Sequence, residues 1–408
     1  TAIDFPASRR TFLRDRVAPF ENAVSLLYGA GRLHEGRELA ALATDMRHEA
    51  TVSLGRRAPQ PEIVPWTVSE RAVLDLLAND RAAALEGLRN GSVWPRTPAK
   101  PLQDRTSSSD KPILRYPKAA QGYLVDCQTG TAARRTAVTA TEAELATWIA
   151  DLLDAAERGE VDEVSRAALF QALLGEVYDL VRSAAAVSVL PDGVIASIPF
   201  DLLCTEDPRP RFVYLPGNAA PRVAHSAGNR ATLLIGDPDL QGTQAEAAAL
   251  AAAAELTQEP LTVASLMEAL SDPPKLLHIS GHFQAVPGDA SASAFLLATG
   301  ETIELRDLAQ LIDGVGDVAP ELVFLSLCDS ALQEATPEAA IDLPSLFLTL
   351  GARAVIGAAW KIADYDAAPF AVAFYTALAQ GEEVPGAFAT AMSKTGFRGF
   401  KLFQSEPL

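Results

Sequence analysis

A histidine and a cysteine each follow a short apolar run in the second half of the chain. His282 comes shortly after the run Leu276–Ser280, and Cys328 comes shortly after the run Leu322–Ser326. Both runs are apolar and β-prone, as is typical of buried strands in a parallel sheet. A thiol becomes a strong nucleophile when a nearby imidazole takes its proton. Because parallel strands end at the same edge of a sheet, the pattern predicts a Cys-His dyad at that edge.

The segments around these two runs predict the sheet that must hold them. Neighbouring parallel strands need a crossover, and Thr302–Gly314 is predicted to supply it as a short helix. Apolar runs at Ala231–Ile235 and Ala354–Ala358 predict two further strands. Strand and helix patterns alternate through the last 180 or so residues, which predicts a mostly parallel sheet with helices on both faces.

Other segments predict elements outside that alternation. Val187–Leu190 and Val194–Ile198 flank an Asp-Gly pair, which favours a tight β-hairpin. Gly399–Phe403 is predicted as a closing edge strand.

The chain resembles the CHAT family, a caspase-like peptidase domain that is related to separase and usually attached to TPR repeats. The resemblance covers roughly residues 120–405. Caspase-like proteases also place the His about 50 residues before the Cys, a separation similar to the one here. The motifs that carry the resemblance occur in the family's order, and they are Leu190–Gly193, Ile198–Leu203, Leu234–Pro238, His278–His282, Leu325–Ser330 and Gly351–Trp360.

The resemblance implies a role for each residue of the dyad. Cys328 would be the nucleophile and His282 the base, with backbone N–H groups of Phe283 and Cys328 holding the oxyanion. Two positions depart from the family pattern. Phe283 stands where the family has Gly, and Leu327 stands where it often has Ala. A positive φ at the first position would strain any residue other than glycine.

A turn rich in Asp is a candidate substrate pocket. The segment Trp360–Asp366 resembles the separase-type turn whose Asp lines the pocket for a basic P1 side chain. Asp364 would then form a bidentate pair with a substrate Arg, and Asp366 lies in the same turn. An alternative role for Asp364 is the N-cap of the following helix. Asp329, beside the nucleophile, would either shape the pocket or solvate its rim.

His278 lies two pleats before His282 on the same face of the predicted strand. We interpret it as a hydrogen-bonded core histidine. Two His residues four positions apart chelate a metal on a helix rather than on a strand, so no metal site is expected. The phosphate-binding, nucleophile-elbow and zinc-protease motifs are absent from the sequence, and no cofactor is expected.

Charge and composition restrict the partners. The 408 residues carry 34 basic and 52 acidic side chains, a net charge of −18. Nucleic acid and anionic membrane surfaces need clustered Lys and Arg, so neither is expected as a direct partner. The acidity suits a basic peptide substrate, or it serves only as solubilising surface charge. Three widely spaced cysteines, no signal segment and no uninterrupted apolar run of membrane-spanning length predict a cytoplasmic protein.

We expect two regions along the chain. Residues 1–112 are predicted to form a helical N-terminal extension and a linker, and residues 113–408 the peptidase-like domain. Within 8–55, two helices are expected to join at Tyr28–Arg32, as either the last unit of a TPR array or a plain helical hairpin. The chain begins at Thr1 rather than Met, so we expect it to be part of a longer protein.

The predicted fold is therefore α/β, with a caspase-like mostly parallel sheet flanked by helices and an N-terminal α-helical extension. The resemblance implies a cysteine endopeptidase that cleaves protein substrates and is regulated by a protein partner, in a bacterial defence or cell-death pathway. The alternative is a catalytically inactive CHAT scaffold whose dyad is degraded. A third interpretation, an α/β domain that binds an apolar ligand or a nucleotide, has no motif in its favour.

Overall fold

The computed structural model describes two parts of the chain, 21–40 and 111–405. Within these parts it does not describe 22, 30, 33–34, 38, 120–121, 131, 206–209, 216–223, 226–227, 287–291, 313–317, 329 and 332–341. The sequence pattern predicts a helix over 69–88, a linker over 90–112 and a loop over 331–342. The helix, most of the linker and most of the loop lie outside the described residues.

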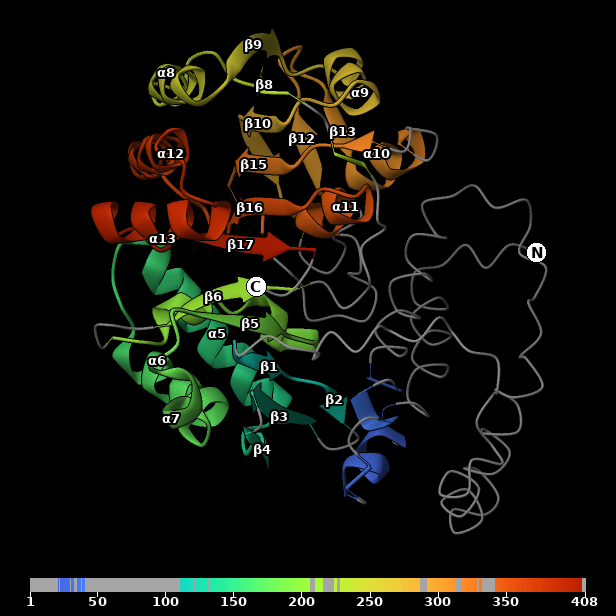
Figure 1. The fold of residues 1–408 in the computed structure, drawn as a ribbon, viewed down its shortest axis with the longest axis vertical. Coiled ribbons are helices and arrows are strands. Elements are labelled where there is room, and N and C mark those ends of the chain that lie inside the picture. Colours follow the sequence, from blue (N-terminus) through green and yellow to red (C-terminus); the bar gives the residue numbers. More distant parts are fainter. Residues whose placement is uncertain are drawn as a thin grey trace, which may run out of the picture.

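A mostly parallel sheet of twelve strands forms the centre of the described structure (Figure 1). Its order is β2-β3-β1-β5-β6-β17-β16-β15-β10-β8-β9, and β4 also pairs with β3. Seven of its eleven described pairings are parallel. The strands are β1 (Ile113–Arg115), β2 (Lys118–Ala119), β3 (Gly122–Thr129), β4 (Ala132–Ala137), β5 (Ala186–Leu190), β6 (Arg211–Tyr214), β8 (Arg230–Ile235), β9 (Glu255–Pro260), β10 (Leu276–Ser280), β15 (Leu322–Ser326), β16 (Ala354–Ala358) and β17 (Phe400–Gln404).

Helices cover both faces of this sheet, as predicted. Figure 1 shows α8 (Thr243–Ala253), α12 (Asp364–Ala379) and α13 (Val384–Thr395) on one side. On the other side lie α9 (Val263–Ser271), α10 (Leu305–Leu311) and α11 (Leu343–Thr349).

Alternate residues of each central strand enter two separate cores. In β15, Val323 and Leu325 belong to one core cluster, while Leu322 and Phe324 belong to the other. Every residue of β10, β15 and β16 is buried. Burial on both faces explains why these strands are continuous apolar runs in the sequence.

The other half of the sheet carries a second group of helices. These are α5 (Glu142–Glu157), α6 (Glu163–Phe170) and α7 (Tyr178–Val181). The sequence pattern predicts one continuous helix over 160–184, but a π-helical turn, η1 (Gln171–Gly175), separates α6 from α7.

The β-hairpin predicted around Asp192-Gly193 is wrong. The first half is a strand, β5, but its neighbours are β1 and β6, both parallel to it. The second half is a 3₁₀ helix, η2 (Gly193–Ser197). Its start is fixed by polar contacts, because the Asp192 carboxylate accepts from the Gly193 N–H at 2.9 Å and the Tyr123 hydroxyl accepts from the Val194 N–H at 3.1 Å. The N–H groups of Gly193 and Val194 therefore have hydrogen-bond acceptors without pairing to a second strand.

The closing strand β17 is central, which corrects the prediction that Gly399–Phe403 forms an edge strand. It pairs antiparallel with β16 and parallel with β6, and so joins the two halves of the sheet. Its Lys401 is only 1% exposed. The Lys401 Nζ donates to the Ala196 carbonyl at 2.7 Å and lies 4.4 Å from the centre of the Tyr214 ring.

A helical hairpin near the N-terminus packs on the far end of the sheet. Described residues within 21–29 and 35–40 are helical, and Gly31, with φ of 73°, lies in the turn between them. Leu124 of β3 packs against a small core in this hairpin, which consists of Ala23, Val24, Leu27, Tyr28 and Leu39.

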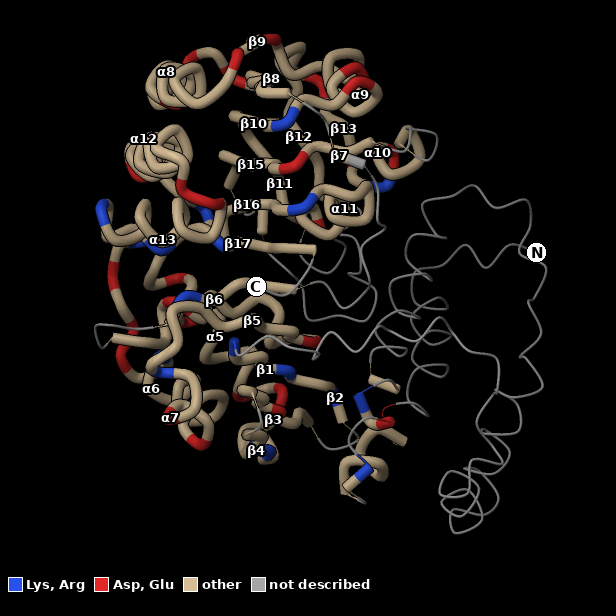
Figure 2. The backbone as a smooth tube through the Cα atoms, in the orientation of Figure 1, with Lys and Arg blue, Asp and Glu red and all other residues tan. Residues whose placement is uncertain are grey.

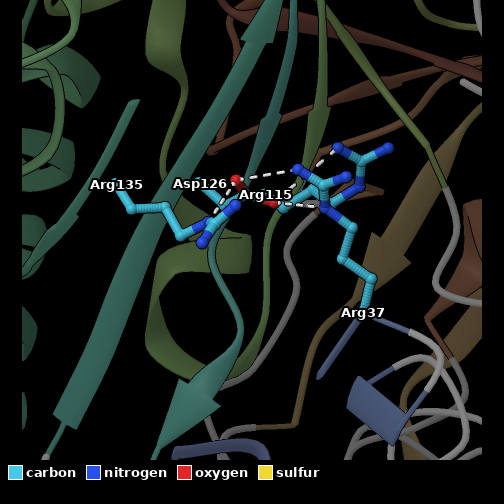
Figure 3. Close-up of polar contacts among 4 residues, drawn as sticks. All are labelled: Arg37, Arg115, Asp126 and Arg135. Atoms are coloured by element: carbon cyan, nitrogen blue, oxygen red, sulfur yellow. Dashed lines mark hydrogen bonds and ion pairs between the residues drawn. The ribbon is translucent and has the colours of Figure 1, made fainter. Parts of the chain in front are cut away.

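A buried ion cluster also links the hairpin to β3 (Figure 3). Asp126 is fully buried. Its carboxylate accepts from Arg37 at 2.7 and 3.1 Å and from Arg135 at 3.0 Å, and Arg115 lies 4.0 Å away. Burial opposes ionisation of Asp126, but the hydrogen bond and charge of Arg37, together with the other two guanidinium groups, lower its pKa.

The division of the chain at residue 112 stays a prediction.

Lys and Arg residues are scattered over the described elements rather than gathered on one of them (Figure 2). The described ranges contain no helix with the length and apolarity that crossing a bilayer requires.

Candidate active site

Three neighbouring parallel strands end together at one edge of the sheet. In their register, Ile235 of β8 lies opposite Ser280 of β10, and Ser280 lies opposite Ser326 of β15. Two residues beyond these aligned positions the chain carries three side chains that could do chemistry, which are Asp237, His282 and Cys328. Adjacent strands lie about 4.8 Å apart, so the sheet places the predicted base and nucleophile at matching positions on neighbouring strand ends.

Glycine lets these strand ends approach closely. Backbone pairing continues past the strands, because the Gly236 N–H donates to the Ser280 carbonyl at 2.7 Å and the Gly281 N–H donates to the Ser326 carbonyl at 3.3 Å. A Cβ atom on Gly281 would lie 3.1 Å from the Cα of Gly236 and 3.4 Å from its nitrogen. A larger residue would therefore push the backbones of β8 and β10 apart just before their functional side chains.

His282 contacts the carboxylate of Asp237. The His282 Nε2 lies 2.8 Å from the Asp237 Oδ2, and the other carboxylate oxygen accepts from the Asp239 N–H at 2.9 Å. The Asp239 N–H and then the His282 hydrogen bond lower the pKa of Asp237. Asp237 lies in the motif Leu234–Pro238, but the sequence pattern assigns it no role. The signal that could have found it is its position, two residues past an apolar run, as for His282 and Cys328.

Cys328 is the cysteine with access to solvent. Cys127 and Cys204 are buried, whereas Cys328 is partly exposed. Burial, followed by the charge of Asp126, raises the pKa of the Cys127 thiol to about 12, which suits a structural position rather than a nucleophile. The Cys328 thiol donates to the Ile362 carbonyl at 3.4 Å.

Ser330 fixes the chain just after the cysteine. Its hydroxyl donates to the Leu325 carbonyl at 3.3 Å and accepts from the Ala358 N–H at 2.8 Å. The Ala331 N–H then donates to the Ala358 carbonyl at 2.7 Å. The segment after Cys328 is thereby attached to the end of β16.

Both departures from the family pattern are accommodated by packing. Phe283 lies in β11 (His282–Gln284), which pairs with β12 (Ala294–Leu296) in a small sheet completed by β13 (Thr302–Glu304). The extended backbone of a strand strains no residue type. The Phe283 ring packs edge-on against Phe295 with centroids 5.4 Å apart. Leu327 is 1% exposed and belongs to the core.

The acidic turn lies next to Cys328, because the Ile362 carbonyl that accepts from the Cys328 thiol belongs to it. Asp364 is the first residue of α12, and Ala363 is the N-cap, so the N-cap interpretation of Asp364 is wrong. Asp366 is half-buried, and its N–H donates to the Ala363 carbonyl at 2.9 Å. Asp329 and the side chain of Asp364 lie outside the described residues.

A buried polar network lies beneath the strand ends. His278 is fully buried, which agrees with its interpretation as a core histidine. Its Nδ1 lies 2.8 Å from the Tyr375 hydroxyl, and its Nε2 lies 3.2 Å from Glu246 of α8. Glu246 also accepts from the Ser326 hydroxyl at 2.7 Å. Burial opposes ionisation of Glu246, but His278, Ser326 and Ser280 outweigh it and lower its pKa.

The sequence pattern did not reveal the role of Glu246, since it is one acidic residue in an Ala-rich helix. Among the residues with described positions, no three His, Cys, Asp or Glu side chains are grouped so that they could hold a metal ion.

A mostly parallel sheet with His and Cys at adjacent strand ends is the arrangement of caspase-like α/β proteins. A family model described as the CHAT domain matches residues 162–395, which is more than half of the chain. The chain therefore belongs to the CHAT domain family. A comparison with curated proteins finds no match.

Solved structures support the predicted caspase-like fold. The separase of a Saccharomyces cerevisiae separase–securin complex, at 3.0 Å resolution, is 9% identical with a TM-score of 0.53, over 91% of this chain and 36% of that one. A second structure of this complex, at 2.6 Å, gives 13% identity and a TM-score of 0.37 over 60% and 17% of the two chains. The Arg-specific cysteine proteinase gingipain R is 11% identical with a TM-score of 0.37, over 65% of this chain and 74% of that one. The chain thus spans about a third or less of the separase chains, and at 9% identity the likeness shows the fold alone.

Proposed function

We propose that this protein is a cysteine endopeptidase that cleaves protein substrates after a basic residue. The observation that carries the proposal is the register of β10 and β15, which pairs Ser280 with Ser326, so that His282 and Cys328 each follow two residues after the carboxyl ends of adjacent parallel strands. A Cys-His pair needs this proximity and little else to generate a thiolate.

The proposed reaction has two stages. His282 takes the proton of the Cys328 thiol, and the thiolate attacks the scissile carbonyl to form a tetrahedral intermediate. Backbone N–H groups of Cys328 and Phe283 stabilise its oxyanion. Protonated His282 then donates to the leaving amine, and the acyl-enzyme forms. In the second stage His282 takes a proton from water, the hydroxide attacks the thioester, and the thiol and the product acid are released.

The basic P1 preference rests on the turn that touches the nucleophile. Ile362 accepts from the thiol, and Asp364 begins a helix two residues later. Arg binds a carboxylate in bidentate fashion, so an Asp in the turn beside the thiol is the proposed partner of a basic P1 side chain. Asp366 and Asp329 are further candidates for this pocket.

We also propose that a protein partner regulates the activity. The yeast separase structures that share this fold are complexes with securin, and a partner is a common means of control for such a fold. A bacterial, cytoplasmic role in defence follows from the family resemblance alone and is part of the proposal.

Cleavage of a fluorogenic peptide library with every P1 residue tests the proposal. We expect cleavage after Arg or Lys, its abolition in Cys328→Ala, and a loss of at least about 10³-fold in His282→Ala. In Asp364→Asn we expect kcat/KM for Arg substrates to fall about 10- to 100-fold. Asp151→Asn, an exposed charge on α5, is the matched control and leaves kcat/KM unchanged. Absence of cleavage of every peptide, with and without candidate partner proteins, would favour the inactive scaffold.

A further inference from the structure

We infer that Asp237 is a positioning residue for His282, so that the site works as an Asp-His-Cys row rather than as a dyad. The inference rests on the proposed peptidase function, since it assigns His282 the role of base.

The sheet itself produces the row. β8, β10 and β15 are consecutive and parallel, and the register places Ile235, Ser280 and Ser326 side by side. Asp237, His282 and Cys328 each come two residues after these aligned strand ends, so the proposed acid, base and nucleophile follow at equivalent places along three neighbouring segments. His282 follows the middle strand, and its Nε2 lies 2.8 Å from the Asp237 carboxylate.

The contact fixes which ring nitrogen is free. An ionised carboxylate only accepts hydrogen bonds, so the Nε2 at 2.8 Å from Asp237 must carry the hydrogen. In neutral imidazole the other nitrogen, Nδ1, then has the lone pair. Asp237 thereby selects the tautomer of His282 whose Nδ1 can accept the proton of the thiol.

Orientation, rather than charge, is the main contribution of Asp237. The side chains of His282 and Asp237 are 46% and 31% exposed, and water strongly screens the charges of an exposed pair. Tautomer and ring orientation are not weakened by such screening. The carboxylate is itself held, because its second oxygen accepts from the Asp239 N–H.

The Asn variant separates this role from a local structural one. Asp237→Asn keeps a carbonyl oxygen for the Asp239 N–H, so the turn is preserved. The amide NH₂ group then donates toward His282, and only a lone pair on Nε2 can accept this hydrogen bond. The hydrogen of the neutral ring therefore moves to Nδ1. The variant therefore favours the wrong tautomer in an intact turn.

The experiment combines peptide kinetics with ¹⁵N NMR of the His282 ring. In Asp237→Asn we expect kcat to fall between about 10- and 10⁴-fold, with KM changed less than about threefold. Asp237→Glu restores part of the loss. Asp151→Asn removes the same charge at an exposed position of α5 far along the chain, leaves kcat unchanged and is the control. In Cys328→Ala protein, we expect the ring to be protonated at Nε2, and to shift to Nδ1 when Asp237→Asn is added.

The two readouts distinguish the two proposals. If the wild type cleaves peptides and Asp237→Asn matches it in kcat and in tautomer, the inference about Asp237 is overturned while the peptidase proposal stands. If no peptide is cleaved, the peptidase proposal fails, and the NMR comparison alone decides whether Asp237 sets the His282 tautomer.

Discussion

Gly281 and Gly236 face each other across β10 and β8, with room for hydrogen atoms but not for a methyl group. A Cβ atom on Gly281 would meet the Gly236 Cα at 3.1 Å, and each glycine directly precedes a member of the row, His282 or Asp237. The distance between two glycines thus determines how closely the base and its carboxylate partner can approach.

Gly281→Ala should therefore damage both the site and the fold. The strand ends must separate by a few tenths of an ångström, so we expect about tenfold slower modification of Cys328 and about 1 to 3 kcal/mol lower unfolding free energy. Alkylation rates and urea unfolding measure the two effects. Gly386→Ala in α13, where the nearest atom to a new Cβ lies at 3.4 Å, is the control, and an equal effect in both variants would contradict this explanation.

The Glu246–His278 pair should stabilise the fold strongly. Both side chains are buried, so removing one partner leaves a buried polar group uncompensated. Glu246→Leu is expected to lower the unfolding free energy by about 3 to 5 kcal/mol, as measured by urea unfolding.

The double variant Glu246→Leu/His278→Leu should lose less than the sum of its single variants, because neither buried partner then remains alone. Glu268→Gln, on the exposed side of α9, should change the free energy by less than about 0.5 kcal/mol. Strict additivity in the double variant would show that the pair is not coupled.

Lys401 should make stability depend on pH above neutrality. Burial, partly offset by Asp342, lowers its pKa to about 7. At pH below 7 both states carry the proton and the fold bears the cost of the buried charge. Between pH 7 and about 10.5 only the unfolded chain retains the proton, so stability rises with pH.

Lys401→Met removes this dependence. We expect the unfolding free energy of the wild type relative to Lys401→Met to rise by roughly 3 to 5 kcal/mol from pH 7 to pH 10.5, at about 1.4 kcal/mol per pKa unit. Lys394→Met, at an exposed position of α13, should give a flat difference. If the difference in unfolding free energy between the wild type and Lys401→Met also stayed constant with pH, the buried amine would have an ordinary pKa.

Arg37 should hold the N-terminal hairpin on β3. It makes two hydrogen bonds to the buried Asp126, each a charge-assisted contact worth about 1.5 to 3 kcal/mol. Arg37→Met is expected to raise amide hydrogen exchange within 21–40 by at least about tenfold while β10 and β15 stay protected. Arg32→Met removes a local pair with Glu35 and should have little effect, so similar exchange in the two variants would refute the anchoring role.

The sequence predicts the site where burial alone determines it. β10, β15 and β16 are buried on both faces, so each appears as an uninterrupted apolar run, and the residues just past two of these runs are His282 and Cys328. The bounds of β16 match the prediction for the same reason.

Strand order is what the sequence pattern could not supply. No local signal shows that β8 lies beside β10, so from the sequence alone Asp237 is indistinguishable from the Asp of an ordinary Asp-Pro turn. In the same way, β17 looks like a terminal edge strand until its pairing with β16 and β6 is known. Asp-Gly at 192–193 favours a hairpin locally, but side-chain contacts from Asp192 and Tyr123 turn the segment into a 3₁₀ helix instead.

Intact-mass labelling with a peptidyl electrophile that bears Arg at P1 tests the central claim most directly. We predict one label on Cys328 in the wild type, none in Cys328→Ala, at least about 100-fold slower labelling in His282→Ala, and weaker labelling in Asp364→Ala. Failure to label Cys328, or labelling at the same rate with and without His282, would contradict the claim that these strand ends form a cysteine peptidase site.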